Sequence, residues 1–289
     1  MPSAYLLVSH GSRDPRPQVA MERLVWLLSQ SLTSNAQLQT AGMHGYRGAE
    51  EQGRVGDKET ITNYQLPIQN PKSKTRPQDG VRGRQNLKSL HSPLVGSACL
   101  ELSALALHQQ IAEFADRALE LGCDRLQIVP LFLLPGVHVM EDIPAEVALA
   151  QQMRQLKLEV RPYLGSHPGL IRLLASQIDR LKTWILLAHG SSRAGAKQPT
   201  EAIARQLEIL SAYWAIAPSL ESRVRESIGR GDRQVGILPY FLFAGGITDA
   251  IAQKVKQLQE QFPSVDFHLA QPLGASQELA DLILDLVEK

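Results

Sequence analysis

The sequence predicts an α/β protein of two similar domains, each a parallel β-sheet flanked by helices. Two observations support this fold class. Short apolar runs alternate with segments of helical periodicity along the chain, which is typical of βαβ units. The two halves of the chain also match each other, which indicates an internal duplication. We expect residues 1–182 to form an N-terminal domain with the functional site, and residues 183–289 to form a C-terminal domain that is a degenerate repeat.

The match between the halves consists of three pairs of segments in the same order. "YLLVSHGSR" (Tyr5–Arg13) matches "ILLAHGSSR" (Ile185–Arg193), and "VPLFLLPGV" (Val129–Val137) matches "LPYFLFAGG" (Leu238–Gly246). The third pair is "RPYLGSHPGL" with "AQPLGASQEL", and the last two pairs share one offset of 109 residues. Three matches in one order are hard to obtain by chance.

Each half supplies its own strands and helices. In the first half, strands are expected at Tyr5–Ser9 and Leu126–Leu134, and helices over Met21–Leu32 and Leu107–Leu121, the latter stopped by Gly122. In the second half, a helix carries Ile203, Leu207, Leu210 and Trp214, a strand spans Val235–Phe243, and a further helix carries Ile251, Val255, Leu258 and Phe262.

The first half is longer than the second. His10 and Pro130 lie 120 positions apart, whereas His189 and Pro239 lie 50 positions apart. The excess falls mostly at residues 42–92, a tract rich in Gly, Gln, Asn, Lys and Arg. This composition predicts a flexible surface insertion, and the alternative is a lid or a basic docking arm.

Composition narrows the function classes. A formal net charge of +1 gives the chain no global field that would attract nucleic acid or an anionic membrane. No uninterrupted apolar run approaches the roughly 20 residues that span a bilayer, and the N-terminus lacks the pattern of a signal peptide. Cys99 and Cys123 lack CxxC spacing and are expected to be buried free thiols in a reducing compartment. We therefore expect a cytoplasmic protein.

Three candidate metal ligands fall at the carboxyl ends of predicted strands in the first half. His10 follows the strand "YLLVS", His138 follows "LQIVPLFLLPG", and Glu101 follows the apolar run "PLVGSACL" and opens the second helix. Ligands bind at this edge of open parallel sheets, so the three side chains could face one cleft. Two imidazoles and a carboxylate suit a divalent transition metal and leave coordination positions open.

Each of these residues alone has an ordinary structural explanation, such as a loop histidine or a carboxylate at a helix start. The repeat acts as an internal control. In the second half, His189 is the counterpart of His10. Ile247 stands in place of His138, and Ala215 stands in place of Glu101. The second half thus keeps the scaffold but loses two of the three candidates. This pattern favours a single working site in the first half.

With "VSHGSRDP", "ACLELS" and "PLFLLPGVHVMEDIP", the chain resembles the sirohydrochlorin chelatases of the CbiX/SirB type. These class II chelatases insert a divalent metal into a tetrapyrrole without ATP. The resemblance covers both halves and excludes the insertion at residues 42–92. It implies that His10, Glu101 and His138 bind metal and handle protons. It also implies no tightly bound cofactor, with Fe²⁺ or Co²⁺ as the metal substrate and Ni²⁺ as a further option.

The substrate implied by the resemblance, sirohydrochlorin, carries eight carboxylates. Arg13, Arg16 and Arg193 are candidate bidentate anchors for them. Neither nucleic acid nor a membrane is expected as a partner, and the duplicated chain suits a monomer or a loose dimer.

Two other functions stay open at this point. A metal or tetrapyrrole carrier would need the same ligands without turnover. A phosphohydrolase using a phosphohistidine would normally have an arginine directly before the histidine, where this chain has Ser9 and Ala188.

Overall fold

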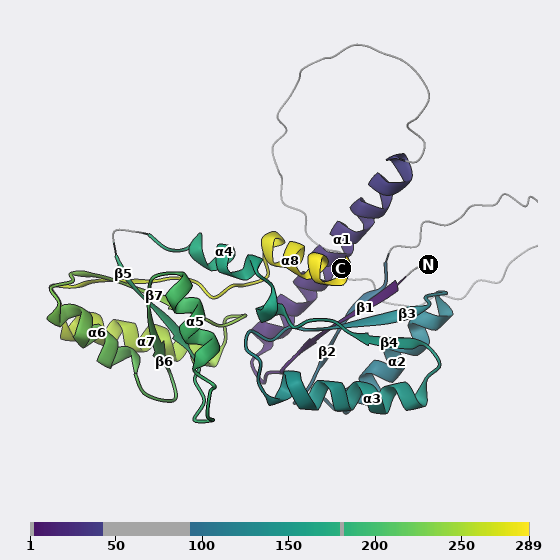
Figure 1. Cartoon of the computed structure of the whole chain (residues 1–289), viewed down its shortest axis with the longest axis horizontal. Coiled ribbons are helices and arrows are strands. Elements are labelled where there is room, and N and C mark those ends of the chain that lie inside the picture. The colour runs from purple at the N-terminus through teal and green to yellow at the C-terminus, as the bar shows by residue number, and fades with distance from the viewer. Residues whose placement is uncertain (1–2, 43–92, 180–181, 289) are drawn as a thin grey trace, which may run out of the picture. The chain divides into compact units, whose positions relative to one another are not determined.

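Two four-stranded parallel sheets form the framework of the protein, one in each half of the chain (Figure 1). The computed structural model describes residues 3–42, 93–179 and 182–288. The first half contains, in chain order, β1 (Ser3–Ser9), α1 (Pro15–Gly42), β2 (Val95–Cys99), α2 (Leu107–Glu120), β3 (Arg125–Pro130), a π-helical turn η1 (His138–Asp142), α3 (Ile143–Met153), β4 (Lys157–Val160), a 3₁₀ turn η2 (Leu164–Ser166) and α4 (Gly169–Ala175).

The second half follows the same plan without the long first helix. It contains β5 (Thr183–Ala188), α5 (Gln198–Gln206), β6 (Leu210–Tyr213), α6 (Leu220–Gly229), β7 (Gln234–Pro239), α7 (Gly246–Gln261), β8 (Asp266–Leu269) and α8 (Gln277–Glu288).

The two sheets have the same topology, which confirms the predicted fold class and the duplication. The strand orders are β2-β1-β3-β4 and β6-β5-β7-β8. The register agrees as well, because Val8 lies opposite Pro130 and Leu187 lies opposite Pro239. Every described strand pair is parallel, so the carboxyl ends of each sheet's strands lie at one edge.

The first sheet is covered on both faces (Figure 1). Leu6 and Val8 of β1 pack into a core with α2 and α3. Leu7, which points to the other face, packs into a second core with α1 and α8. This alternation follows from the two-residue period of a strand, and a sheet buried on both faces reads as a continuous apolar run.

Helix α8 lies at the end of the second half but packs against the first. It contacts β3 and α4, and Arg161 at the end of β4 donates from Nε and Nη2 to the Leu286 carbonyl at 3.0 and 2.8 Å. His167, which is buried, lies with Nε2 2.6 Å from Oδ2 of Asp285. A cation at the C-terminal end of a helix satisfies its free carbonyls and interacts favourably with its dipole.

We expect Arg161→Ala to lower the free energy of unfolding by about 1–3 kcal/mol, because the Leu286 carbonyl loses two charge-assisted hydrogen bonds. Arg172→Ala is the matched control, since Arg172 is exposed on α4 and its side chain has no polar partner among the described residues. Urea unfolding of both variants measures the difference. Equal effects would show that Arg161 does not hold α8.

The structure corrects two sequence predictions. Leu210 and Trp214 are not on the helix with Ile203, because α5 ends at Gln206 and Leu210–Tyr213 is strand β6. Glu208 has φ 56° and lies between the two elements, and this left-handed residue ends the helix. Glu101 does not open the second helix either, because α2 begins at Leu107 and Glu101 lies in the preceding loop.

The two apolar strands are shorter than predicted. They end at Pro130 and Pro239, and the apolar residues that follow them are loop. The predicted insertion at residues 42–92 lies, apart from Gly42 at the end of α1, outside the described residues. The domain boundary at residues 182 and 183 stays a prediction. Within the described part of the chain, no helix has both the length and the apolar composition needed to cross a bilayer.

Candidate metal centre

His10, Glu101 and His138 lie at one edge of the first sheet. His10 directly follows β1, Glu101 lies two residues beyond β2, and His138 is the first residue of η1 after β3. These three strands are neighbours in the order β2-β1-β3. Because the strands are parallel, their carboxyl ends bring the three loops together.

A backbone contact joins two of the loops. The Glu101 N–H donates to the His10 carbonyl at 2.9 Å. Gly11 has φ +100°, and a Cβ at this position would lie 2.1 Å from the Glu101 carbonyl oxygen. Any side chain here would push the Glu101 loop away from His10. The contact between the two loops therefore requires glycine directly after His10.

The three side chains converge. One potential ligand atom from each lies within 4.8 Å of the others, and Nε2 of His10 is 3.9 Å from Oε2 of Glu101. The rings of His10 and His138 stand edge to face, with centroids 4.9 Å apart and an interplanar angle of 84°. Ligands on one ion about 2.1 Å away are separated by about 3–4 Å, so small side-chain rotations would close this group around a metal.

The site is open to solvent on one side. The side chains of His10 and Glu101 are about half exposed, at 50% and 51%. Phe132 lies near both imidazoles, with its ring centroid 6.4 Å from that of His10 and 6.1 Å from that of His138. A partly exposed group of three ligands can take up and release an ion, as an exchange site requires.

Asp142 holds the ring of His138. Its Oδ2 lies 2.7 Å from Nδ1 of His138, one π-helical turn away. A carboxylate on Nδ1 fixes the tautomer and leaves Nε2 free as an acceptor or a metal ligand. Asp142 is not among the predicted site residues, although its spacing of four residues from His138 is a usable sequence signal.

We expect Asp142→Asn to weaken metal binding by about 10–100-fold, because the imidazole loses the carboxylate that orients it. The matched control is Glu146→Gln, since Glu146 makes the same kind of contact with Nδ1 of His108 at 2.8 Å, away from the three ligands. Titration with Co²⁺ followed by absorption measures both affinities. Equal affinities in the two variants would contradict the role of Asp142.

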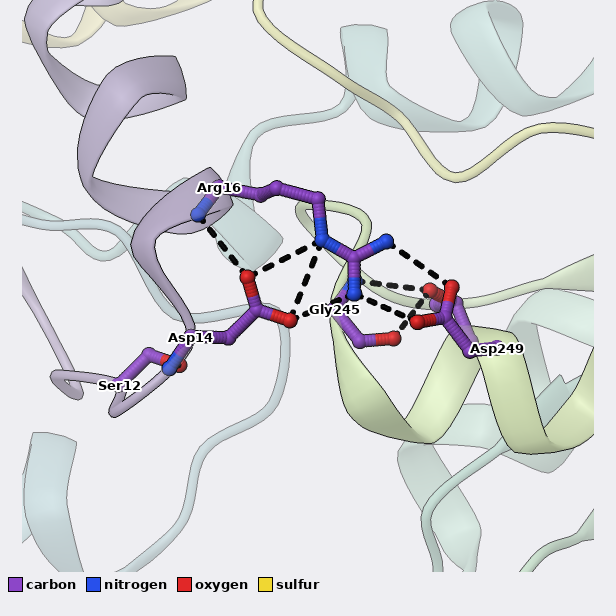
Figure 2. Close-up of polar contacts among 6 residues, drawn as sticks. Ser12, Asp14, Arg16, Gly245 and Asp249 are labelled. Atoms are coloured by element: carbon purple, nitrogen blue, oxygen red, sulfur yellow. Dashed lines mark hydrogen bonds and ion pairs between the residues drawn. The ribbon is translucent and has the colours of Figure 1, made fainter.

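The structure places the three predicted anchor arginines in different surroundings. Arg13 is exposed, and its guanidinium has no polar partner among the described residues. Arg193 is exposed beside a cavity in the second half. Arg16 is already paired with two carboxylates, those of Asp14 and Asp249 (Figure 2).

The Arg16 pairing connects the two halves. Its Nη1 and Nη2 donate to Asp249 on α7 at 3.0 and 2.6 Å, and its Nε donates to Oδ1 of Asp14 at 3.0 Å (Figure 2). The guanidinium lowers the pKa of Asp14 to about 2 and also lowers the pKa of Asp249. Both carboxylates are therefore ionised at neutral pH. Arg16 can bind a substrate carboxylate only by releasing one of them.

The second half keeps the backbone of the site and His189 but lacks the other two ligands. The Ala215 N–H donates to the His189 carbonyl at 2.9 Å, as the Glu101 N–H does to His10. This contact confirms the predicted correspondence of Ala215 with Glu101. Within the described residues, the His10, Glu101 and His138 group is the one metal-compatible cluster of three, and none forms around His189.

A family model named CbiX matches residues 81–181 and 183–289, well over half of the chain. The chain belongs to the CbiX family. The first matched segment covers the later part of the first half, and the second covers the second half. Glu101 and His138 lie inside the first CbiX segment, whereas His10 precedes it on the far side of the long insertion.

Two similar proteins carry chelatase names. The sirohydrochlorin ferrochelatase of Priestia megaterium is 27% identical over 212 residues, 68% of this chain and 77% of that protein. The sirohydrochlorin cobaltochelatase of the same organism is 26% identical over 199 residues, 62% of this chain and 65% of that protein.

Solved structures share the fold of this chain. SirB from Bacillus subtilis with Fe³⁺ superposes with a TM-score of 0.64 at 18% identity, covering 100% of this chain and 95% of that chain. A CbiX structure described as the terminal enzyme for siroheme biosynthesis in denitrifying bacteria gives a TM-score of 0.55 at 19% identity, covering 99% of this chain and 98% of that chain.

Proposed function

We propose that this protein is a sirohydrochlorin chelatase, a lyase that inserts a divalent metal into the macrocycle without ATP. The observation that carries the proposal is the convergence of His10, Glu101 and His138 at the ligand-binding edge of a CbiX-family fold. The chelatase names of two relatives support the substrate and the reaction.

The reaction places two requirements on the protein. The metal must be held with open coordination positions, and two pyrrole N–H protons must leave before the macrocycle nitrogens can bind the ion. Imidazole takes up protons near neutral pH, so one histidine can accept a proton while the other holds the metal. Their rings lie 4.9 Å apart, close enough to serve the same macrocycle centre.

Glu101 and Asp142 complete the arrangement. Glu101 offsets the charge of the ion and can pass a proton on to solvent, since its side chain is half exposed. Asp142 contacts Nδ1 of His138 and so leaves Nε2 of the same ring free for the metal or a proton. Arg13 and Arg193 remain proposed anchors for the substrate carboxylates, and Arg16 joins them only if Asp14 or Asp249 releases it.

The metal is proposed to be Fe²⁺ or Co²⁺, the ions of the relatives' names, with Ni²⁺ as an untested option. Two imidazoles and a carboxylate can bind all three ions. The ion that is inserted therefore depends on which metal is available in the cell rather than on the geometry of the site. Sirohydrochlorin is the proposed partner molecule. A cytoplasmic location and a monomeric or loosely dimeric state stay predictions from the sequence.

One assay separates the candidate functions. Purified protein is incubated with sirohydrochlorin and Fe²⁺ or Co²⁺, and the visible absorption of the macrocycle is followed against a protein-free control. A chelatase accelerates the spectral change with multiple turnovers, whereas a carrier gives at most one equivalent. The absence of any acceleration would overturn the proposal.

A further inference from the structure

An open cavity of about 490 Å³ lies at the carboxyl edge of the second sheet. Ser191, Ser192 and Arg193, which follow β5, line one side of it, and Ile216 and Ala217, which follow β6, line another. The cavity therefore lies next to the loop that carries Ala215, the counterpart of Glu101.

Two cations at this cavity lack a carboxylate partner within the described residues. Neither Arg193 nor Lys197 forms an ion pair there, and the Lys197 ammonium lies 5.6 Å from the centre of the Tyr213 ring. Glu201 lines the same cavity, which leaves a net charge of +1 on the lining. Arg16 in the first half differs, because two carboxylates already occupy its guanidinium.

The rest of the lining suits a carboxylate on a short carbon chain. Ser191 and Ser192 supply hydroxyl groups, and Ile216 and Ala217 supply an apolar wall. The loop is folded back on itself, because the Arg193 N–H donates to Oγ of Ser191 at 3.3 Å. The cations and hydroxyls can donate charge-assisted hydrogen bonds to a carboxylate, and the apolar wall can contact the carbon chain that bears it.

We propose that this cavity binds a carboxylate arm of the tetrapyrrole, with Arg193 and Lys197 as its charged contacts. The inference rests on the proposed function, which supplies a macrocycle with eight such carboxylates. The two halves then divide the work. The first half holds the metal, and the second half, which lacks two of the three metal ligands, holds the edge of the macrocycle.

The test measures macrocycle binding and metal binding separately. Arg193→Gln and Lys197→Gln remove the charge and keep a polar side chain. Arg205→Gln is the control, since Arg205 is an exposed cation on α5, the helix that follows Lys197, and lies outside the cavity lining. We expect each cavity variant to bind metal-free sirohydrochlorin about tenfold more weakly by fluorescence titration. The affinity of the cavity variants for Co²⁺ alone should not change. The Arg205→Gln variant should bind sirohydrochlorin as the wild type does.

Two further arms sharpen the result. Arg193→Lys should recover part of the affinity, because the charge returns. A sirohydrochlorin methyl ester, which has no ionised carboxylates, should bind the wild type and the cavity variants equally. If the wild type binds and converts sirohydrochlorin while the cavity variants match it, the cavity proposal is wrong and the function stands. If the wild type neither binds nor converts it, both proposals are wrong.

Discussion

His138→Ala is expected to slow metal insertion into sirohydrochlorin by at least about a hundredfold. The substitution removes one of three converging ligand side chains and the imidazole whose ring lies 4.9 Å from that of His10. No other described residue of the site can replace both functions. Steady-state rates with Fe²⁺ or Co²⁺ measure the loss, and Co²⁺ titration shows whether binding or turnover is affected. Since the His138 side chain is 35% exposed, little packing is lost.

His189→Ala is the matched control for this prediction. His189 follows β5 as His10 follows β1, and the adjoining loop makes the same backbone contact to it. No group of three potential metal ligands forms around it among the described residues, so its loss should reduce the rate no more than about threefold. Equal losses in both variants would contradict a single site in the first half.

Much of the site could be predicted because it depends on topology alone. Once β1, β2 and β3 are neighbours in a parallel sheet, the residues that follow them lie at the same edge. Side-chain packing elsewhere in the sheet does not alter this. His10, Glu101 and His138 could therefore be grouped from strand ends and from the repeat. The error over the start of α2 did not affect this grouping, because Glu101 needs only to follow β2.

The parts that sequence patterns missed depend on backbone torsions and long-range pairs. The helix pattern from Ile203 to Trp214 fails at Glu208, whose left-handed torsion no periodicity encodes. The pairing of Arg16 with Asp249 joins residues 233 positions apart. A candidate substrate anchor thus proves to be a link between the halves, which only the three-dimensional structure can show.

The second half offers a gain-of-function experiment. We expect the double variant Ala215→Glu/Ile247→His to bind a second Co²⁺ ion, raising the stoichiometry from one to two per chain. His189 is already present, and Ala215 matches Glu101 through the same backbone contact. Ala215 is exposed and Ile247 is 37% exposed, so the new groups do not bury an unpaired charge.

The single variants separate this prediction from non-specific binding. Ala215→Glu alone and Ile247→His alone supply only two ligands with His189 and should leave one ion per chain in equilibrium dialysis. If the folded double variant still binds one ion, then matching positions in the two halves are not sufficient to bring the three ligands together. The grafted site also lacks an orienting carboxylate. The repeat offset puts Ile251 where Asp142 stands, and Ile251 is fully buried. The second ion should therefore bind about 10–100-fold more weakly than the first.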